Sequence, residues 1–323
     1  MGANYAIGKG GMVLCALVAL AMCVLAFVLQ PVSVISSNPG ICLPPVAEWN
    51  LIPQFGWAIN TFLIVATTLG SYYLNNTFNF IRSPHPVLPA AFCLLLSSNA
   101  WISGNLSSAM ILCAVVMGCM AILFSSYNSK NATQEMFVTA TFFGVGSMFE
   151  IAFIPMIIPM ILGANVMKIL RFKEIIAFVL GLVAPYWVGV GLGLIPLEAF
   201  HLPDLSLLFS SGHDLTDFFF LLLDTGILAL AGLLIGVSCA IRLYAGNAFV
   251  SAMNFSVAIT GLIAIAFAAI DFSNITAYLA VFYFSVAVQI SQLCALWKMR
   301  HEWIVVTLIA LLSIGFFIST LIG

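Results

Sequence analysis

The chain has 323 residues, of which 63% are hydrophobic and only 6% are charged, and its mean hydropathy is +1.19. A soluble domain carries about 25% charged residues, so this composition predicts an all-α polytopic membrane protein. There is no polar stretch long enough for an extramembrane catalytic domain, and a net charge of −2 offers no basic face for nucleic acid. Residues 1–323 are therefore expected to form a single integral membrane domain.

The first apolar run follows Lys9 and extends from Gly11 to about Leu29. It is longer than the apolar core of a typical signal peptide, so we interpret it as a retained span, with a cleaved signal as the alternative. The further full spans are expected at Ile52–Leu74, Val87–Trp101, Leu106–Phe124, Ile175–Leu194, Phe218–Ile241, Ala248–Ile270, Ile275–Trp297 and Trp303–Ile322. Polar residues inside these spans are expected to make helix–helix hydrogen bonds. They are Asn60, Asn254, Gln289 and Gln292.

The stretch between Lys130 and the cationic segment 168–173 determines the predicted topology. It contains an almost uncharged run, Met136–Met167, of about 32 residues, which is too long for one span and too short for two ordinary spans with a turn. A single crossing would put Lys130 and Lys168 on opposite faces of the membrane, against the bias of Lys and Arg toward the cytoplasm. Both constraints predict a hairpin that returns to its starting side.

The two arms of this hairpin are expected at Met136–Phe143 and Glu150–Leu162, with Gly144–Ser147 as the break between them. The tip of the hairpin would then carry Glu150. Whether the arms form a re-entrant hairpin or two short full spans is left open. With nine full spans and the hairpin, the bundle would have about eleven helices.

Under this topology all nine Lys and Arg residues fall on one side, which the positive-inside rule assigns to the cytoplasm. We therefore expect a bacterial inner-membrane protein with a cytoplasmic N-terminus and a periplasmic C-terminus. The opposite loops contain acids and no Lys or Arg. These acids are Glu48, Glu198, Asp204, Asp214 and Asp271.

His213, Asp217 and Asp224 form the first candidate site. Their spacings of four and seven residues place them on one face of a helix. Asp224 would lie about two turns inside the bilayer, where a carboxylate is costly and usually faces a partner or a wet cavity. The pattern predicts a proton-accessible acidic stripe, with Asp217 and Asp224 as catalytic candidates. The alternative is that these residues mark the start of a helix at the membrane interface, with Asp214 or Asp217 near its cap and with Asp224 neutral or hydrogen-bonded.

Three further features provide candidate residues. Glu150 is placed where a helix dipole favours an anion, either as a ligand-binding group or as an ordinary first-turn acid. Glu48 is either a catalytic carboxylate in an outer loop or a solvated acid. Lys168, Arg171 and Lys173 either hold lipid phosphates or only set the topology. No Cys or His spacing suggests a metal site, and no cofactor is expected.

Several passages resemble an uncharacterised family of Bacteroidota inner-membrane proteins. They are Leu74–Arg82, Pro86–Ser97, Phe149–Pro155, Arg171–Ile176 and Gly181–Pro185. The resemblance covers roughly residues 50–195 and implies no established activity. The helix-rich plan and the entry into the third span also resemble polyprenol-dependent glycosyltransferases and polymerases of the cell envelope, at the level of fold alone.

Three functions fit these features. The leading hypothesis is a non-catalytic subunit or scaffold of an envelope or secretion assembly, with membrane proteins and membrane lipids as partners. The second is an enzyme that takes a polyprenol-linked sugar from the bilayer, with Glu48 as general base and Asp214 or Asp217 as rivals. The absence of Lys and Arg from the outer loops counts against it. The third is a proton-coupled transporter built on the hairpin and on Asp217 and Asp224, weakened by the missing internal repeat.

Overall fold

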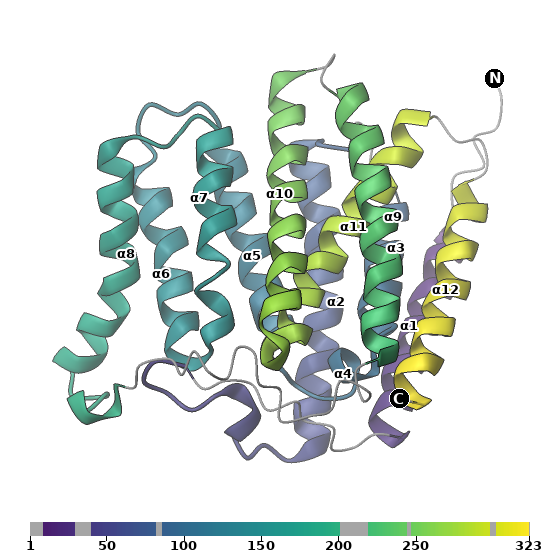
Figure 1. Cartoon of the computed structure of the whole chain (residues 1–323), viewed down its shortest axis with the longest axis horizontal. Helices are drawn as coiled ribbons and strands as arrows, with labels where there is room; N and C mark the ends of the chain where they lie inside the picture. Colours follow the sequence, from purple (N-terminus) through teal and green to yellow (C-terminus); the bar gives the residue numbers. More distant parts are fainter. Residues whose placement is uncertain are drawn as a thin grey trace.

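The computed structural model describes residues 9–29, 40–81, 86–200, 219–243, 247–297 and 302–322. These residues form twelve α-helices and no strand, which confirms the all-α class. Most of the helices run along one common direction and form a bundle (Figure 1).

In chain order the helices are α1 (Lys9–Leu29), α2 (Pro53–Phe78), α3 (Val87–Ser97), α4 (Ala100–Ser103), α5 (Ser108–Ser125), α6 (Thr133–Phe149), α7 (Ile157–Val166), α8 (Phe172–Gly191), α9 (Phe219–Leu243), α10 (Ala248–Ile270), α11 (Ile275–Trp297) and α12 (Glu302–Ile322). Short 3-10 turns lie between some of them. These are η1 (Val46–Glu48), η2 (Ile151–Phe153), η3 (Leu197–Ala199) and η5 (Phe272–Asn274).

Seven helices of the described chain, namely α1, α5 and α8–α12, are long and apolar enough to cross a membrane. The protein is therefore a polytopic integral membrane protein. The predicted nine full spans are not confirmed. Helix α2 has 26 residues but is more polar than these seven, because glutamine, asparagine, serine and threonine side chains occur along its whole length.

The predicted third span, Val87–Trp101, is divided into α3 of 11 residues and α4 of 4 residues. Asn99 causes the division, because its backbone is extended and its side chain accepts a hydrogen bond from the Trp101 N–H at 2.9 Å. An asparagine in this arrangement caps a new helix rather than continuing the old one. Helix α3 is therefore too short to span a bilayer, which takes roughly 20 residues.

The predicted hairpin is present, but its break was misplaced. Helix α6 continues through Gly144–Ser147, and the chain turns over residues 150–156 before α7. The two glycines permit close packing: a Cβ at Gly144 would lie 2.7 Å from the Leu182 carbonyl oxygen of α8, and one at Gly146 would overlap the Phe153 ring. The two arms also pack on different neighbours, α6 on α8 and α7 on α10.

Both ends of the hairpin lie at the same end of the bundle, as predicted. The Asn128 N–H donates to the Met167 carbonyl at 3.0 Å, and Arg171 Nη1 donates to the Lys130 carbonyl at 3.1 Å. We call this the basic end. It holds every Lys and Arg whose side chain the structure describes, which are Lys130, Lys168, Arg171 and Lys173.

The opposite end, which we call the acidic end, carries Glu48, Glu150, Glu198 and Asp271 (Figure 1). Acids are not confined to it, since Glu135 and Glu174 lie in the first turns of α6 and α8 at the basic end. The remaining predicted outer acids, Asp204 and Asp214, lie outside the described residues.

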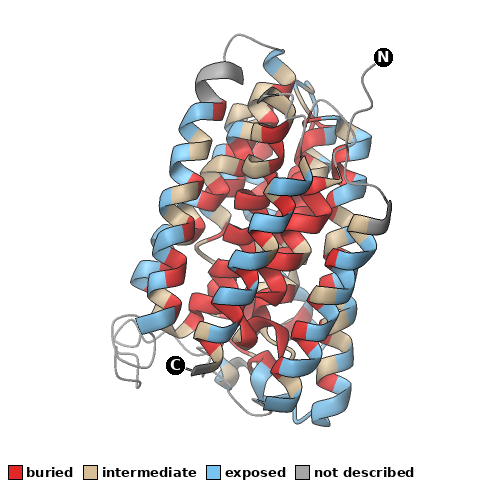
Figure 2. Cartoon of the chain, turned by 90° about the vertical axis from the view of Figure 1, so that its right-hand side faces the viewer, coloured by how far each residue is buried: buried red, intermediate tan, exposed pale blue. Residues whose placement is uncertain are grey.

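Helix α11 lies at the centre of the bundle. Of its spanning segment 72% is buried, against 28% for α8 and α9, and α11 packs against α3, α5, α9 and α10. Figure 2 shows the buried residues as an inner column, surrounded by helices whose outer sides are exposed. Polar groups on α11 are therefore enclosed by protein, whereas the peripheral helices present apolar side chains to lipid.

Candidate functional site

A group of polar side chains gathers where α11 begins. The Asp271 carboxylate accepts hydrogen bonds from the Ser273 hydroxyl at 2.6 Å, the Asn274 amide at 2.8 Å and the Tyr278 hydroxyl at 3.0 Å. Asp271 is 1% exposed and Tyr278 is fully buried. Burying a carboxylate is costly unless donors replace its hydration. The three donors therefore account for its position in the interior.

Glu150 joins this group from the hairpin. It ends α6 with an extended backbone, is 1% exposed, and acts electrostatically on Tyr278. Two carboxyl groups from distant parts of the chain therefore act on one tyrosine, Asp271 through a hydrogen bond and Glu150 through its charge. Asn274 contributes a further acceptor, since its Oδ1 has no hydrogen-bond partner in the described part of the chain. We call Glu150, Asp271, Asn274 and Tyr278 the Tyr278 cluster.

Residues 40–49 lie across the turn that carries Glu150 (Figure 1). The N–H groups of Gly40, Ile41 and Leu43 donate to the last carbonyls of α6 at 2.9, 3.1 and 2.8 Å. These carbonyls have no partner inside their own helix, so the loop satisfies them. The Val46 N–H donates to Glu150 Oε1 at 3.2 Å. The loop and the Tyr278 cluster are therefore joined through the Glu150 carboxyl group.

A second group lies around Tyr283. Five helical residues beyond Tyr278, Tyr283 points to a largely different side of α11. Its side chain interacts with that of Asn99, at the break between α3 and α4, and with the charge of Asp224 on α9. Asp224 is 6% exposed and accepts a hydrogen bond from the Ser319 hydroxyl of α12. We call Asn99, Asp224, Tyr283 and Ser319 the Tyr283 cluster.

The polar side of α11 continues from Tyr278 toward the basic end through Ser285, Gln289 and Gln292. The Ser285 hydroxyl donates to the Val257 carbonyl of α10 at 3.0 Å. Gln292 is 1% exposed, and neither of its amide atoms has a hydrogen-bond partner among the described residues. A buried amide without a partner is costly, so this position is suited to a ligand or water.

Of the four polar residues, Asn60 forms the expected helix–helix hydrogen bond, from α2 to the Ile102 carbonyl of α4 at 2.8 Å. Asn254 of α10 donates instead to the Phe80 carbonyl, in the turn after α2, at 2.9 Å. Gln289 donates only within α11, to Ser285 at 3.4 Å. The expectation is wrong for Gln292.

The other predicted site residues are separated from the two clusters. Glu48 is exposed at the end of η1. Lys168, Arg171 and Lys173 are exposed at the basic end. His213 and Asp217 lie outside the described residues, so of the predicted acidic stripe only Asp224 is placed.

Several residues of the clusters had no predicted role. Asp271, Asn274 and Tyr278 are spaced at i, i+3 and i+7, which is one face of a helix and was a detectable signal. The pairing of Asn99 with Tyr283 had no such signal, because the two residues belong to helices far apart in the sequence. Among the described residues, no group of three or more His, Cys, Asp or Glu side chains could hold a metal ion.

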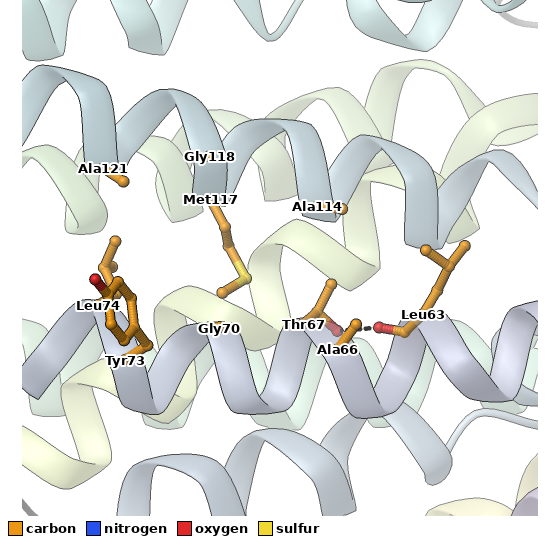
Figure 3. A pocket seen from close by; sticks show the side chains of 10 residues that line it. All are labelled: Leu63, Ala66, Thr67, Gly70, Tyr73, Leu74, Ala114, Met117, Gly118 and Ala121. Carbon is orange, nitrogen blue, oxygen red and sulfur yellow. Dashed lines mark hydrogen bonds between the residues drawn. The ribbon is translucent and has the colours of Figure 1, made fainter.

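An apolar groove of about 290 Å³ lies between α2 and α5 (Figure 3). Its lining is Leu63, Ala66, Thr67, Gly70, Tyr73, Leu74, Ala114, Met117, Gly118 and Ala121. The Thr67 hydroxyl donates to the Leu63 carbonyl of its own helix at 2.8 Å. The groove contains no charged side chain and suits hydrocarbon only, so it adds no chemistry to the two clusters.

No protein-family model, curated protein or solved structure matches the chain. Its class therefore follows from the structure itself. It is a polytopic integral membrane protein whose central helix connects two buried carboxyl–tyrosine clusters.

Proposed function

We propose that the protein is a proton-coupled membrane transporter and that the Tyr278 cluster binds the coupling proton. One observation carries this proposal: Glu150 and Asp271 are each 1% exposed and both act electrostatically on the buried Tyr278. Every Lys and Arg side chain in the described residues lies at the other end of the bundle. Ionisable groups inside membranes are costly and commonly serve in proton relays. Burial disfavours the charged form of a carboxyl group, so an enclosed carboxyl group is suited to binding a proton.

Interrupted helices adjoin both clusters, which supports the same function. Glu150 lies in the turn between α6 and α7, and Asn99 lies in the break between α3 and α4. Transporters commonly build their binding sites at discontinuous helices, where backbone groups are free of helical partners. The polar side of α11, ending at Gln292, extends from the Tyr278 cluster toward the basic end and is a candidate path. By the positive-inside bias we assign the basic end to the cytoplasm of a bacterial cell.

The proposal is tested by measuring proton binding at the cluster directly. Infrared difference spectra of the reconstituted full chain between pH 5 and pH 8 should contain the band of a protonated carboxyl group. We expect this band to disappear in Glu150→Gln or Asp271→Asn. The matched control is Glu198→Gln, which makes the same chemical change at an exposed acid of the same end and should leave the band intact.

A dye-based measurement of proton uptake into proteoliposomes under an imposed membrane potential provides the second readout. Uptake should fall at least tenfold in Glu150→Gln and Asp271→Asn, and it should stay at the wild-type level in Glu198→Gln. If Glu150→Gln and Asp271→Asn both leave the carboxyl band and the uptake rate unchanged, proton coupling at this site is refuted.

A second function, that of a non-catalytic subunit of an envelope assembly, is supported by α8. This helix packs chiefly on α6, and its Phe172 and Trp187 are each 78% exposed, which leaves a broad apolar side for another membrane protein. A pull-down in mild detergent tests it. Stoichiometric recovery of a complex, with function retained in Glu150→Gln and Asp271→Asn, would favour the subunit over the transporter. Function retained in Glu48→Gln, Asp217→Asn and Asp224→Asn as well would also count against the enzyme.

The glycosyltransferase interpretation has less support. Glu48 is exposed, and no described Lys or Arg at the acidic end is available to hold a lipid diphosphate, which such cations bind through charge-assisted hydrogen bonds. A polyprenol-linked substrate found next to Glu48 would support the glycosyltransferase function.

A further inference from the structure

Two loops at the basic end form one cationic surface. Lys130 belongs to the α5–α6 loop, Lys168 and Arg171 belong to the α7–α8 loop, and Lys173 lies in the first turn of α8. All four side chains are exposed. The loops are joined by the Arg171–Lys130 and Asn128–Met167 hydrogen bonds and by a third from Lys173 Nζ to Asn131 Oδ1 at 2.8 Å. We call these four cations the basic loop cluster.

The positive charge of this cluster is only partly neutralised. Lys173 Nζ lies 3.6 Å from the buried Glu174 carboxylate, and this is the one ion pair described for the cluster. Bringing four cations together is unfavourable unless counter-charge is present. The surface therefore favours an anion from its surroundings.

The start of α8 adds a second, independent preference for an anion. Arg171 occupies the N-cap position with an extended backbone and makes no side-chain capping hydrogen bond. The first N–H groups of α8 have no partner inside the helix, and the helix dipole places partial positive charge there. Helix N-termini of this kind bind phosphate groups.

Exposed apolar side chains lie next to these donors. Phe172, between Arg171 and Lys173 in the sequence, is 78% exposed, and Ile175 and Ile176 are each 45% exposed. They belong to a helix of spanning length, so the lipid chains of the same leaflet surround them. An anion bound at the start of α8 would therefore have hydrocarbon immediately beside it.

We propose that the basic loop cluster binds the phosphate of an anionic phospholipid, whose acyl chains lie along the exposed side of α8. Arg171 and Lys173 contact the phosphate together with the first N–H groups of α8, and Lys130 and Lys168 add to the attraction. This site is at the opposite end from the Tyr278 cluster and does not depend on the proposed transport function.

Native mass spectrometry of the full chain in detergent, titrated with dioleoylphosphatidylglycerol, tests the proposal. Polybasic segments lose roughly fivefold in affinity for anionic lipid with each cation removed. The triple variant Lys130→Gln, Arg171→Gln, Lys173→Gln should therefore bind this lipid at least tenfold more weakly. Dioleoylphosphatidylcholine, with identical chains and no net charge, should bind wild type and variant equally weakly.

The matched control is Lys9→Gln, Arg82→Gln, Lys298→Gln, which removes the same charge from other parts of the chain and should change the affinity less than twofold. Single variants guard against misinsertion of the triple variant: Lys173→Gln should weaken binding roughly fivefold, and Lys173→Arg should retain it. An equal loss in the control triple would show that net charge alone acts and would overturn the proposal. So would equal binding of the two lipids, or displacement of the lipid by millimolar glycerol phosphate, which would identify a site for free phosphate.

Discussion

The substitution Gly40→Ala should release the outer loop from the hairpin. An added Cβ would overlap the carbonyl group of Met148 and the backbone of Phe149, which cannot move without unwinding the end of α6. Residues 40–43 would then lift away. Each backbone hydrogen bond contributes roughly 0.5–1.5 kcal/mol net. Losing those of Gly40, Ile41 and Leu43 therefore destabilises the docked loop by roughly 1.5–4.5 kcal/mol.

Cys42 reports on this release. Its side chain is 9% exposed, and burial raises the pKa of its thiol, so the reactive thiolate is scarce while the loop is docked. A loss of about 1.5 kcal/mol, the lower end of the range for the lost hydrogen bonds, raises the population of the open loop roughly tenfold. Labelling of Cys42 by a membrane-impermeant maleimide should accelerate by at least that factor. It should also reach its full rate at lower pH than in wild type, because the exposed thiol regains its ordinary pKa.

Two controls make the Cys42 measurement specific. Cys42→Ser gives the background from the other cysteines. Gly191→Ala adds a Cβ that meets nothing within 4 Å and should leave the labelling rate unchanged. If Gly40→Ala is labelled at the wild-type rate, the loop is not docked on α6 as described, and the enclosure of Glu150 by that loop must be abandoned.

Three further outcomes are expected. Gly181→Ala should lower the free energy of unfolding by about 1–3 kcal/mol, because the added Cβ would lie 2.9 Å from the Ala140 Cβ and overlap the Phe137 carbonyl. Equilibrium unfolding in detergent measures this loss. Gly226→Ala, where a Cβ meets nothing within 4 Å, should be neutral or stabilising by up to about 1 kcal/mol, and an equal loss in both variants would contradict the packing argument. Cysteines that replace Lys130 and Lys168, one at a time, should be labelled from the same side of the membrane, and a cysteine that replaces Glu48 should be labelled from the other side. Labelling of the Lys130 and Lys168 positions from different sides would refute the hairpin.

Composition and charge placement were enough to predict the class of the protein and the return of the hairpin. An almost uncharged run of about 32 residues can satisfy its backbone hydrogen bonds in lipid only as helix, and its length excludes one span as well as two ordinary ones. Lys130 and Lys168 then had to share a side. These inferences depend on chain length and on the cost of moving charge across a bilayer, which are properties of the sequence.

The positions of the helix breaks were decided by the tertiary structure. Gly144 and Gly146 were expected to break a helix, but a neighbouring helix and the Phe153 ring occupy the space beside them, so the helix continues. Asn99 was expected to lie inside a span, but it caps α4. Glycine and asparagine permit either outcome, and their neighbours in space select one.

The two tyrosine clusters likewise depended on the fold. Asp271 and Asn274 lie in the turn that precedes α11, and Tyr278 lies in its first turn, so their closeness in sequence brings them together. Glu150 comes from the hairpin, far earlier in the chain, and only the fold lets its charge act on Tyr278. Asn99, from the break between α3 and α4, and Asp224, from α9, act on Tyr283 of α11, and Ser319 of α12 donates a hydrogen bond to Asp224. The sequence determined which residues are too polar for lipid. Only the packing of distant helices decided which of them share an enclosed space, because helix–helix contacts in a membrane are made between surfaces that hydropathy does not distinguish.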